Sequence, residues 1–140
     1  MNSIRVVVAD DHAMVRGAIR EILEKVQDIQ VVAEAGSGNE ALKQVSELDP
    51  DVLLLDMRMP ELDGIGVIKN LAKQNSPVKV LVLSAYDGTY YIQGALEYGA
   101  AGYITKDEGP EVLIEAVRKV AKGERGLFSQ KADKAIQETE

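Results

Sequence analysis

The residue that most invites a chemical explanation is Asp56, because it directly follows a run of apolar residues, where a charge is costly. The run Val52–Leu55 has four consecutive apolar side chains and no polar alternation. Such a run is typical of a strand covered on both faces, in the middle of a parallel sheet. Asp56 then lies at the carboxyl end of that strand, the edge where ligands bind in open α/β sheets. The alternative is that Asp56 is an ordinary turn or helix-cap residue.

The ends of the other apolar runs carry further reactive side chains. Asp10 and Asp11 follow the first run, Ser84 follows the fourth and Lys106 follows the fifth. Since parallel strands end at the same edge of a sheet, we expect these side chains to share one crevice with the first carboxylate. Singly, each has a common explanation, with Asp10 and Asp11 as helix caps and Lys106 as a surface lysine. Together, at matching strand ends, they favour a site.

The chemistry that this cluster suits is phosphoryl transfer with a metal ion. Clustered carboxylates repel one another, and a bound cation relieves the repulsion. Oxygen donors without any cysteine favour a hard ion, Mg²⁺ or Mn²⁺. Mg²⁺ usually takes one or two carboxylates, which leaves a third free to attack phosphorus, while Lys106 and the metal would neutralise the phosphoryl oxygens. The single histidine, His12, is interpreted as a turn or helix-start residue without a catalytic part.

The elements that must position these residues alternate along the chain. Five strands are predicted, over residues 4–9, 31–35, 52–55, 78–83 and 101–105, and runs of helical spacing separate and follow them. Pro110 suits the first turn of the fifth helix. This alternation predicts a doubly wound parallel sheet with helices on both faces. For the reactive side chains to meet, the strand order must be 2-1-3-4-5, with the polar second strand at an edge.

Length and composition limit the classes of protein that fit. We expect one folded domain over residues 1–122, followed over 123–140 by a linker or short C-terminal helix. The chain has no cysteine, no apolar run long enough to span a bilayer and no apolar leader, so we expect a cytoplasmic protein without membrane contact. The net charge of -7 argues against non-specific binding of nucleic acid by this part of the protein.

The ordered motifs resemble those of receiver domains of two-component response regulators, over about residues 4 to 122. The motifs that carry the resemblance are Asp10-Asp11-His12, Asp56-Met57-Arg58-Met59-Pro60 with Asp63-Gly64, Ser84-Ala85, and the segment from Gly99 to Asp107. The resemblance implies a flavodoxin-like (βα)5 fold and a signalling protein that catalyses only its own phosphorylation and dephosphorylation.

Two features resemble the NarL/FixJ branch, whose members carry a LuxR-type helix-turn-helix. Lys106 is followed by Asp107, where many receivers have proline, and Gly126-Leu127-Phe128-Ser129 follows the last predicted helix. The branch implies a transcription regulator that reaches DNA only through a C-terminal domain missing here. The alternative is a stand-alone receiver that acts through contacts with other proteins.

By the same resemblance, Asp56 accepts a phosphoryl group from the phosphohistidine of a sensor histidine kinase. Asp10, Asp11 and Asp56 would hold Mg²⁺, with Mn²⁺ as a substitute, and Arg58 would add its backbone carbonyl.

The remaining roles concern the phosphoryl group and the signal. Lys106 and Ser84 would bind the phosphoryl oxygens, and Tyr103 would be the aromatic switch whose rotamer follows Ser84. Phosphorylation is then expected to change the conformation and to favour a homodimer.

Three other functions match part of the pattern. A phosphatase of the haloacid dehalogenase type also uses a strand-end aspartate and Mg²⁺, but it needs a second aspartate where this chain has Arg58. A flavin or nucleotide binder of flavodoxin-like fold needs a loop that accepts phosphate, and the loop over residues 10–14 is acidic. The third is a receiver that serves only as an interaction module, although this chain keeps every residue that the chemistry requires.

Overall fold

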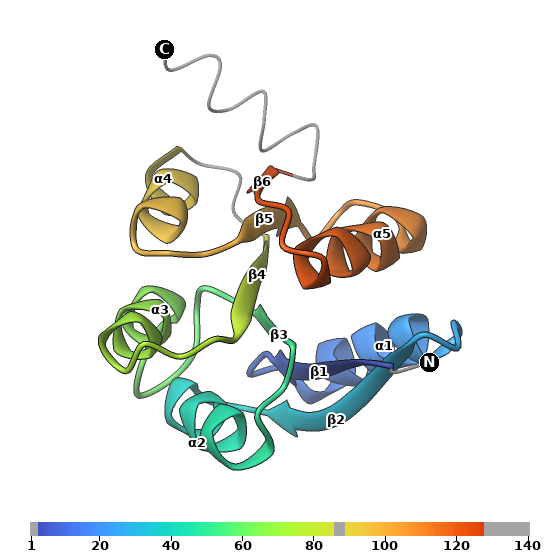
Figure 1. The fold of residues 1–140 in the computed structure, drawn as a ribbon, viewed down its shortest axis with the longest axis horizontal. Coiled ribbons are helices and arrows are strands. Elements are labelled where there is room, and N and C mark those ends of the chain that lie inside the picture. The colour runs from blue at the N-terminus through green and yellow to red at the C-terminus, as the bar shows by residue number, and fades with distance from the viewer. Residues whose placement is uncertain (1–2, 86–88, 128–140) are drawn as a thin grey trace.

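The computed structural model describes residues 3–85 and 89–127 as a parallel sheet with helices on both faces (Figure 1). The strands are β1 (Ile4–Ala9), β2 (Ile29–Ala35), β3 (Val52–Leu55), β4 (Lys79–Ser84), β5 (Gly102–Thr105) and β6 (Gly126–Leu127). The helices are α1 (Ala13–Glu24), α2 (Gly38–Leu48), α3 (Gly64–Lys73), α4 (Thr89–Glu97) and α5 (Pro110–Ala121). The sheet has the order β2-β1-β3-β4-β5-β6. Helices α1 and α5 cover one face, and α2, α3 and α4 cover the other.

The predicted fold class and the order of the first five strands are confirmed. The second strand lies at an edge and begins at Ile29, before the predicted residue 31. The fourth strand ends at Ser84 itself, one residue later than predicted. A sixth strand, which was not predicted, lies within the segment interpreted as a linker, and residues 128–140 of that segment lie outside the described residues.

The central position of β3 in the sheet explains its uninterrupted apolar sequence. All four of its residues are buried, between β1 on one side and β4 on the other. Leu53 and Leu55 pack in the core under α2, α3 and α4, whereas Val52 and Leu54 pack in the core under α1 and α5. Successive side chains of a strand point to opposite faces, so a strand covered on both faces must be apolar throughout.

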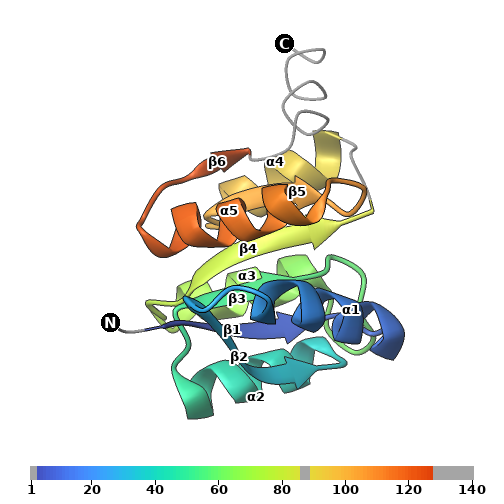
Figure 2. The same ribbon diagram turned by 90° about the vertical axis from the view of Figure 1, so that its right-hand side faces the viewer.

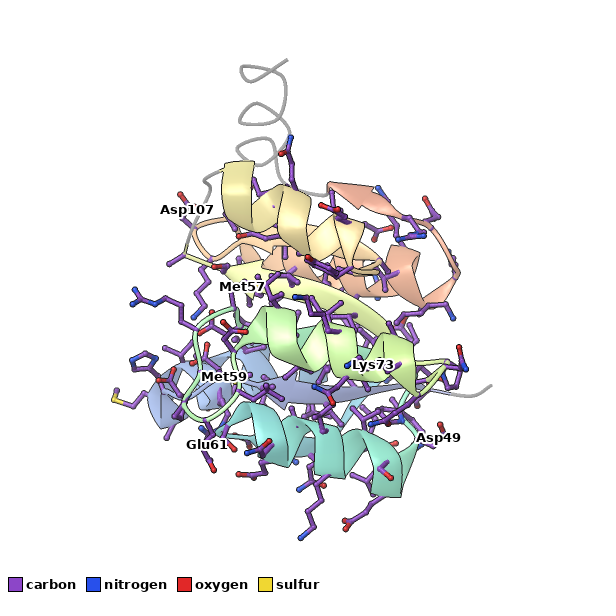
Figure 3. The ribbon with its side chains drawn as sticks, turned by 90° about the vertical axis from the view of Figure 1, so that its left-hand side faces the viewer. Asp49, Met57, Met59, Glu61, Lys73 and Asp107 are labelled. Carbon is purple, nitrogen blue, oxygen red and sulfur yellow. The ribbon has the colours of Figure 1, made fainter. Side chains whose placement is uncertain are left out.

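The strands all run in the same direction, so the loops that follow them gather at one end of the molecule (Figure 2). Figure 3 shows Met57, Met59 and Asp107 at that end, and Asp49 and Lys73 at the opposite end. In the part of the chain that the structure describes, no helix is both long and apolar enough to cross a membrane.

The loop after β3 is held against the start of α3. Asp63 caps this helix, because its Oδ1 accepts the backbone N–H of Gly66 at 2.9 Å. Gly64 donates its own N–H to the carbonyl of Met57 at 2.8 Å. A Cβ on Gly64 would lie 2.8 Å from the Cα of Met57, so only glycine permits this close approach. The contact fixes the course of the chain just after Asp56.

Candidate functional site

Three side chains from three different strand ends meet at the carboxyl edge of the sheet. The ammonium Nζ of Lys106 donates to Asp10 Oδ2 at 2.7 Å and to Asp56 Oδ2 at 3.3 Å. These residues directly follow β5, β1 and β3, and β1 and β3 are neighbours in the sheet. The predicted meeting of these strand-end residues is therefore found in the structure.

The carboxyl group of Asp56 is almost buried, with 6% of the residue exposed, and Asp10 is 1% exposed. Burial raises the pKa of Asp56, and the nearby charge of Asp10 raises that pKa further. The ammonium of Lys106 and a backbone hydrogen bond from Arg58 act in the opposite direction without cancelling the shift. The negative charge on Asp56 is thus incompletely compensated, a condition that a bound cation would correct.

The ammonium of Lys106 remains charged in this setting. Burial acts to lower the pKa of Lys106, but the bonds and charges of Asp10 and Asp56 outweigh burial, and the pKa is raised. Lys106 therefore supplies a permanent positive charge between the two carboxylates.

The loop after β1 places Asp11 and His12 at the rim of the same site. The side chain of Asp11 is 33% exposed, and its Oδ1 lies 2.9 Å from Nδ1 of His12. The same ring nitrogen lies 3.3 Å from Asp10 Oδ1, which also accepts the backbone N–H of His12 at 2.9 Å. His12 is the N-cap residue of α1 and makes no side-chain cap bond. The helix-start interpretation of His12 is confirmed, and the alternative that Asp10 or Asp11 caps this helix is wrong.

An open pocket of about 460 Å³ leads to these groups. It is lined by Asp11, His12, Asp56, Arg58, Met59, Pro60, Ala85 and Lys106. One ligand atom from each of Asp10, Asp11 and His12 lies within 4.8 Å of the others, which is close enough for one cation to reach them. With Asp56 exposed to the same pocket, carboxylate oxygens predominate among the donors, and this set fits a hard divalent ion such as Mg²⁺.

The other predicted site residues, Ser84, Arg58 and Tyr103, differ in where they lie relative to the pocket. Ser84 is fully buried at the end of β4, and its carbonyl accepts the backbone N–H of Lys106 at 2.8 Å. Among the described residues, Ala85 rather than Ser84 lines the pocket wall. Arg58 is exposed at that wall. Tyr103 is fully buried in the core under α2, α3 and α4.

The sequence did not single out Met59 and Pro60 as lining residues, nor the contact of the His12 ring with both carboxylates. Met59 and Pro60 could have been identified from the sequence, because they lie in the loop directly after Asp56. No pattern of spacing shows which way the His12 ring turns.

Comparison with known proteins gives a consistent result. A family model described as the response regulator receiver domain matches residues 6–118. The transcriptional regulatory protein DegU of Brevibacillus brevis is 38% identical over 122 residues, which are 87% of this chain and 52% of DegU. The nitrate/nitrite response regulator protein NarP of Escherichia coli is 35% identical, over 97% of this chain and 63% of NarP. The chain thus spans between about half and two thirds of the length of these relatives.

A solved structure of the same kind of regulator has the same fold. A two-component response regulator of the LuxR family from Aurantimonas sp. superposes with a TM-score of 0.91 and 28% identity, and the match covers 99% of each chain.

Proposed function

The chain belongs to the response regulator receiver domains, in the NarL/LuxR family of regulators, and from this membership we propose that Asp56 is its phosphorylation site. In this proposal Asp56 accepts a phosphoryl group from the phosphohistidine of a sensor histidine kinase. The phosphorylated form then changes conformation and acts on transcription. The chain is a signalling protein, and the only reactions it catalyses are the gain and loss of its own phosphoryl group.

The observation that carries the proposal is the state of Asp56. Its carboxyl group is nearly buried, has a raised pKa and opens to a pocket of about 460 Å³ between Lys106 and the acidic loop after β1. A carboxylate that is poorly solvated but accessible from one side is suited to act as a nucleophile.

The transfer step follows from the positions of the side chains. A carboxylate oxygen of Asp56 forms a bond to phosphorus, the bond from phosphorus to the donor imidazole nitrogen breaks, and the electron pair stays on that nitrogen. Lys106 Nζ, 3.3 Å from Asp56 Oδ2, is placed to hydrogen-bond an equatorial phosphoryl oxygen.

The metal in this proposal is Mg²⁺, with Mn²⁺ as a substitute. Asp10, Asp11 and Asp56, together with the backbone carbonyl of Arg58, are the residues that would hold it. When bound, the ion neutralises charge on the phosphoryl oxygens and on the crowded carboxylates.

The signal would leave the site through β4 and β5. Ser84 lies at the end of β4, and its hydroxyl would turn to the phosphoryl group once that group adds charge beside it. Tyr103, fully buried on the neighbouring strand β5, would follow Ser84 and shift α4. Amide chemical shifts with and without a phosphate mimic test this step, because the proposal requires changes among residues 84–107.

We propose that the whole protein is longer and carries a DNA-binding helix-turn-helix after residues 123–140. The relatives DegU and NarP, of which this chain spans 52% and 63%, support this view over a stand-alone receiver. A sensor kinase as partner, a homodimer after phosphorylation and a cytoplasmic location belong to the same proposal.

The experiment that tests the proposal is intact mass measurement after incubation with acetyl phosphate. The chain should gain about 80 Da, one phosphoryl group, when Mg²⁺ is present and not when it is chelated. Asp56→Asn should gain nothing. A wild-type chain that gains no mass with Mg²⁺ would reduce the protein to an interaction module.

A further inference from the structure

Arg16 on α1 links the loop of the site to the edge strand β2. Its Nη1 donates to the backbone carbonyl of Asp10 at 2.7 Å, and its Nε donates to Glu34 Oε1 at 3.2 Å. The side chain of Arg16 is only 20% exposed. The guanidinium thus holds the peptide group that links Asp10 to Asp11, and Asp11 lines the pocket.

The backbone of Asp10 is fixed on both sides by these contacts. Its N–H donates to the carbonyl of Ala35 on β2 at 3.0 Å, and its carbonyl accepts from Arg16. Because a peptide group is planar, the direction of the Asp10 carbonyl sets the plane of the bond that leads into Asp11. Arg16 therefore controls the angle at which the chain enters Asp11.

The anchor of this clamp is Glu34. Arg20 Nη1 also donates to Glu34, at 3.0 Å, and that bond is the main cause that lowers the pKa of Glu34. The carboxylate therefore stays charged and holds Arg16 from the side of β2. Gly36 leaves room for the guanidinium, since a Cβ there would lie 3.3 Å from Arg16 Nη1.

We propose that Arg16 is a positioning residue for the metal site, which orients Asp11 through the Asp10 carbonyl so that both carboxylates face one ion. This inference rests on the proposed function, in which these carboxylates hold Mg²⁺. It adds a residue outside the pocket to the groups that determine Mg²⁺ affinity.

The chain offers a matched control in Arg20. Arg16→Met and Arg20→Met each remove one positive charge from α1 and one partner from Glu34, but only Arg16 touches Asp10. Mg²⁺ affinity is measured by titration calorimetry on wild type and both variants, at a temperature where circular dichroism shows all three folded. Arg16→Met should weaken Mg²⁺ binding by roughly tenfold or more, as loss of outer partners of metal ligands does. Arg20→Met should stay within about twofold of wild type.

A second measurement separates positioning from a loss of folded protein. The Mg²⁺ concentration that gives half-maximal phosphorylation by acetyl phosphate should rise in Arg16→Met, while the rate at saturating Mg²⁺ returns to within about twofold of wild type. If Arg16→Met does not fold, Arg16→Lys serves in its place. One ammonium cannot bind the Asp10 carbonyl and Glu34 Oε1 together with the geometry of a guanidinium, so the same weakening of Mg²⁺ binding is expected.

The outcomes distinguish this inference from the proposed function. Suppose that the wild-type chain binds Mg²⁺. If Arg16→Met then binds it with unchanged affinity, or Arg20→Met loses as much affinity as Arg16→Met, the positioning role of Arg16 is overturned and the proposed function stands. A wild-type chain that binds no Mg²⁺ overturns the metal site of the proposed function, and the role of Arg16 falls with it.

Discussion

Two pairs of a carboxylate and a cation lie at opposite ends of the sheet, and they differ in what they do to the carboxylate. At the carboxyl edge, Lys106 joins Asp56 at 3.3 Å. At the other end, where the carbonyl of Asp28 accepts the N–H of the first residue of β1, Arg118 binds Asp28 through two bonds of 2.9 Å. Both pairs join segments far apart in the sequence.

The environments set opposite pKa shifts. The two hydrogen bonds from Arg118 lower the pKa of Asp28, whose side chain is 38% exposed, so water and the guanidinium both stabilise its charge. Burial raises the pKa of Asp56 despite its lysine. An exposed fork of two hydrogen bonds suits a structural ion pair, whereas a poorly solvated carboxylate beside one ammonium suits a site that gains a cation or a phosphoryl group.

The largest predicted effect is on the rate of phosphorylation, which should depend on Lys106 and not on Arg118. Lys106→Met should slow phosphorylation by acetyl phosphate about 10²- to 10³-fold, because it removes the fixed charge that faces the phosphoryl oxygens. Arg118→Met should leave the rate within about twofold of wild type. Initial rates from intact mass at fixed Mg²⁺ decide this, and similar losses in both variants would contradict the division of roles.

The next effect concerns stability. Asp56→Asn should stabilise the fold on the order of 1 kcal/mol at pH 7, a common size for single substitutions, because it removes an incompletely compensated buried charge. Urea unfolding of both chains measures the difference. A lower free energy of unfolding in Asp56→Asn would show that the charged carboxylate stabilises the fold, contrary to this prediction.

The stability gain from Asp56→Asn should depend on pH in a defined direction. Because the folded pKa of Asp56 is raised, the folded state keeps this proton to a higher pH than the unfolded chain does. The stability that this group contributes therefore falls as the pH rises through that window. Below about pH 4, the ordinary value for aspartate, both states are protonated and the advantage of the asparagine should vanish.

A smaller effect of opposite sign is expected at the other pair. Asp28→Asn should lower Tm by a few degrees at most, since exposed pairs contribute little. The folded pKa of Asp28 is lowered, so its contribution is present above the unfolded value of about 4 and is lost as the pH falls through the folded pKa. Thermal scans of wild type and variant across this range provide the measurement. An Asp28→Asn chain with a raised Tm at neutral pH would contradict the comparison.

The smallest effect is that of salt. At 1 M NaCl, where the screening length is about 3 Å, the effect of Asp28→Asn on Tm should largely disappear. The stability difference for Asp56→Asn should persist, because buried charges are screened much less. Equal salt sensitivity of the two differences would mean that Asp56 is more solvated than the structure shows.

Much of the fold and the centre of the site could be predicted from the sequence. The uninterrupted apolar run of β3 and the alternation of strands with helices depend on local periodicity, which a sequence displays directly. Given a parallel sheet, the shared location of Asp10, Asp56 and Lys106 could be predicted because each of them directly follows a strand. Their exposure and charge balance did not follow, because burial depends on the packing of whole helices.

The features that were not predicted have no periodic signal. Strand β6 is held to the sheet by backbone pairing with β5, and Gly126 there has a φ of 148°, a conformation that side chains resist. The contacts of Arg16 depend on how α1 lies across the ends of β1 and β2. Glu34 lies inside β2, one residue before its end, so it is not among the residues that follow a strand, and no spacing identifies Arg16 as its partner.

Locating the phosphoryl group tests the role of Asp56 most directly. The chain is phosphorylated with acetyl phosphate and Mg²⁺, reduced with borohydride, which converts an acyl phosphate into an alcohol, and mapped by peptide mass spectrometry. We expect homoserine at position 56 and unchanged aspartate at positions 10 and 11. Reduction at Asp10 or Asp11 with Asp56 intact, or a phosphoryl group on His12, would contradict it.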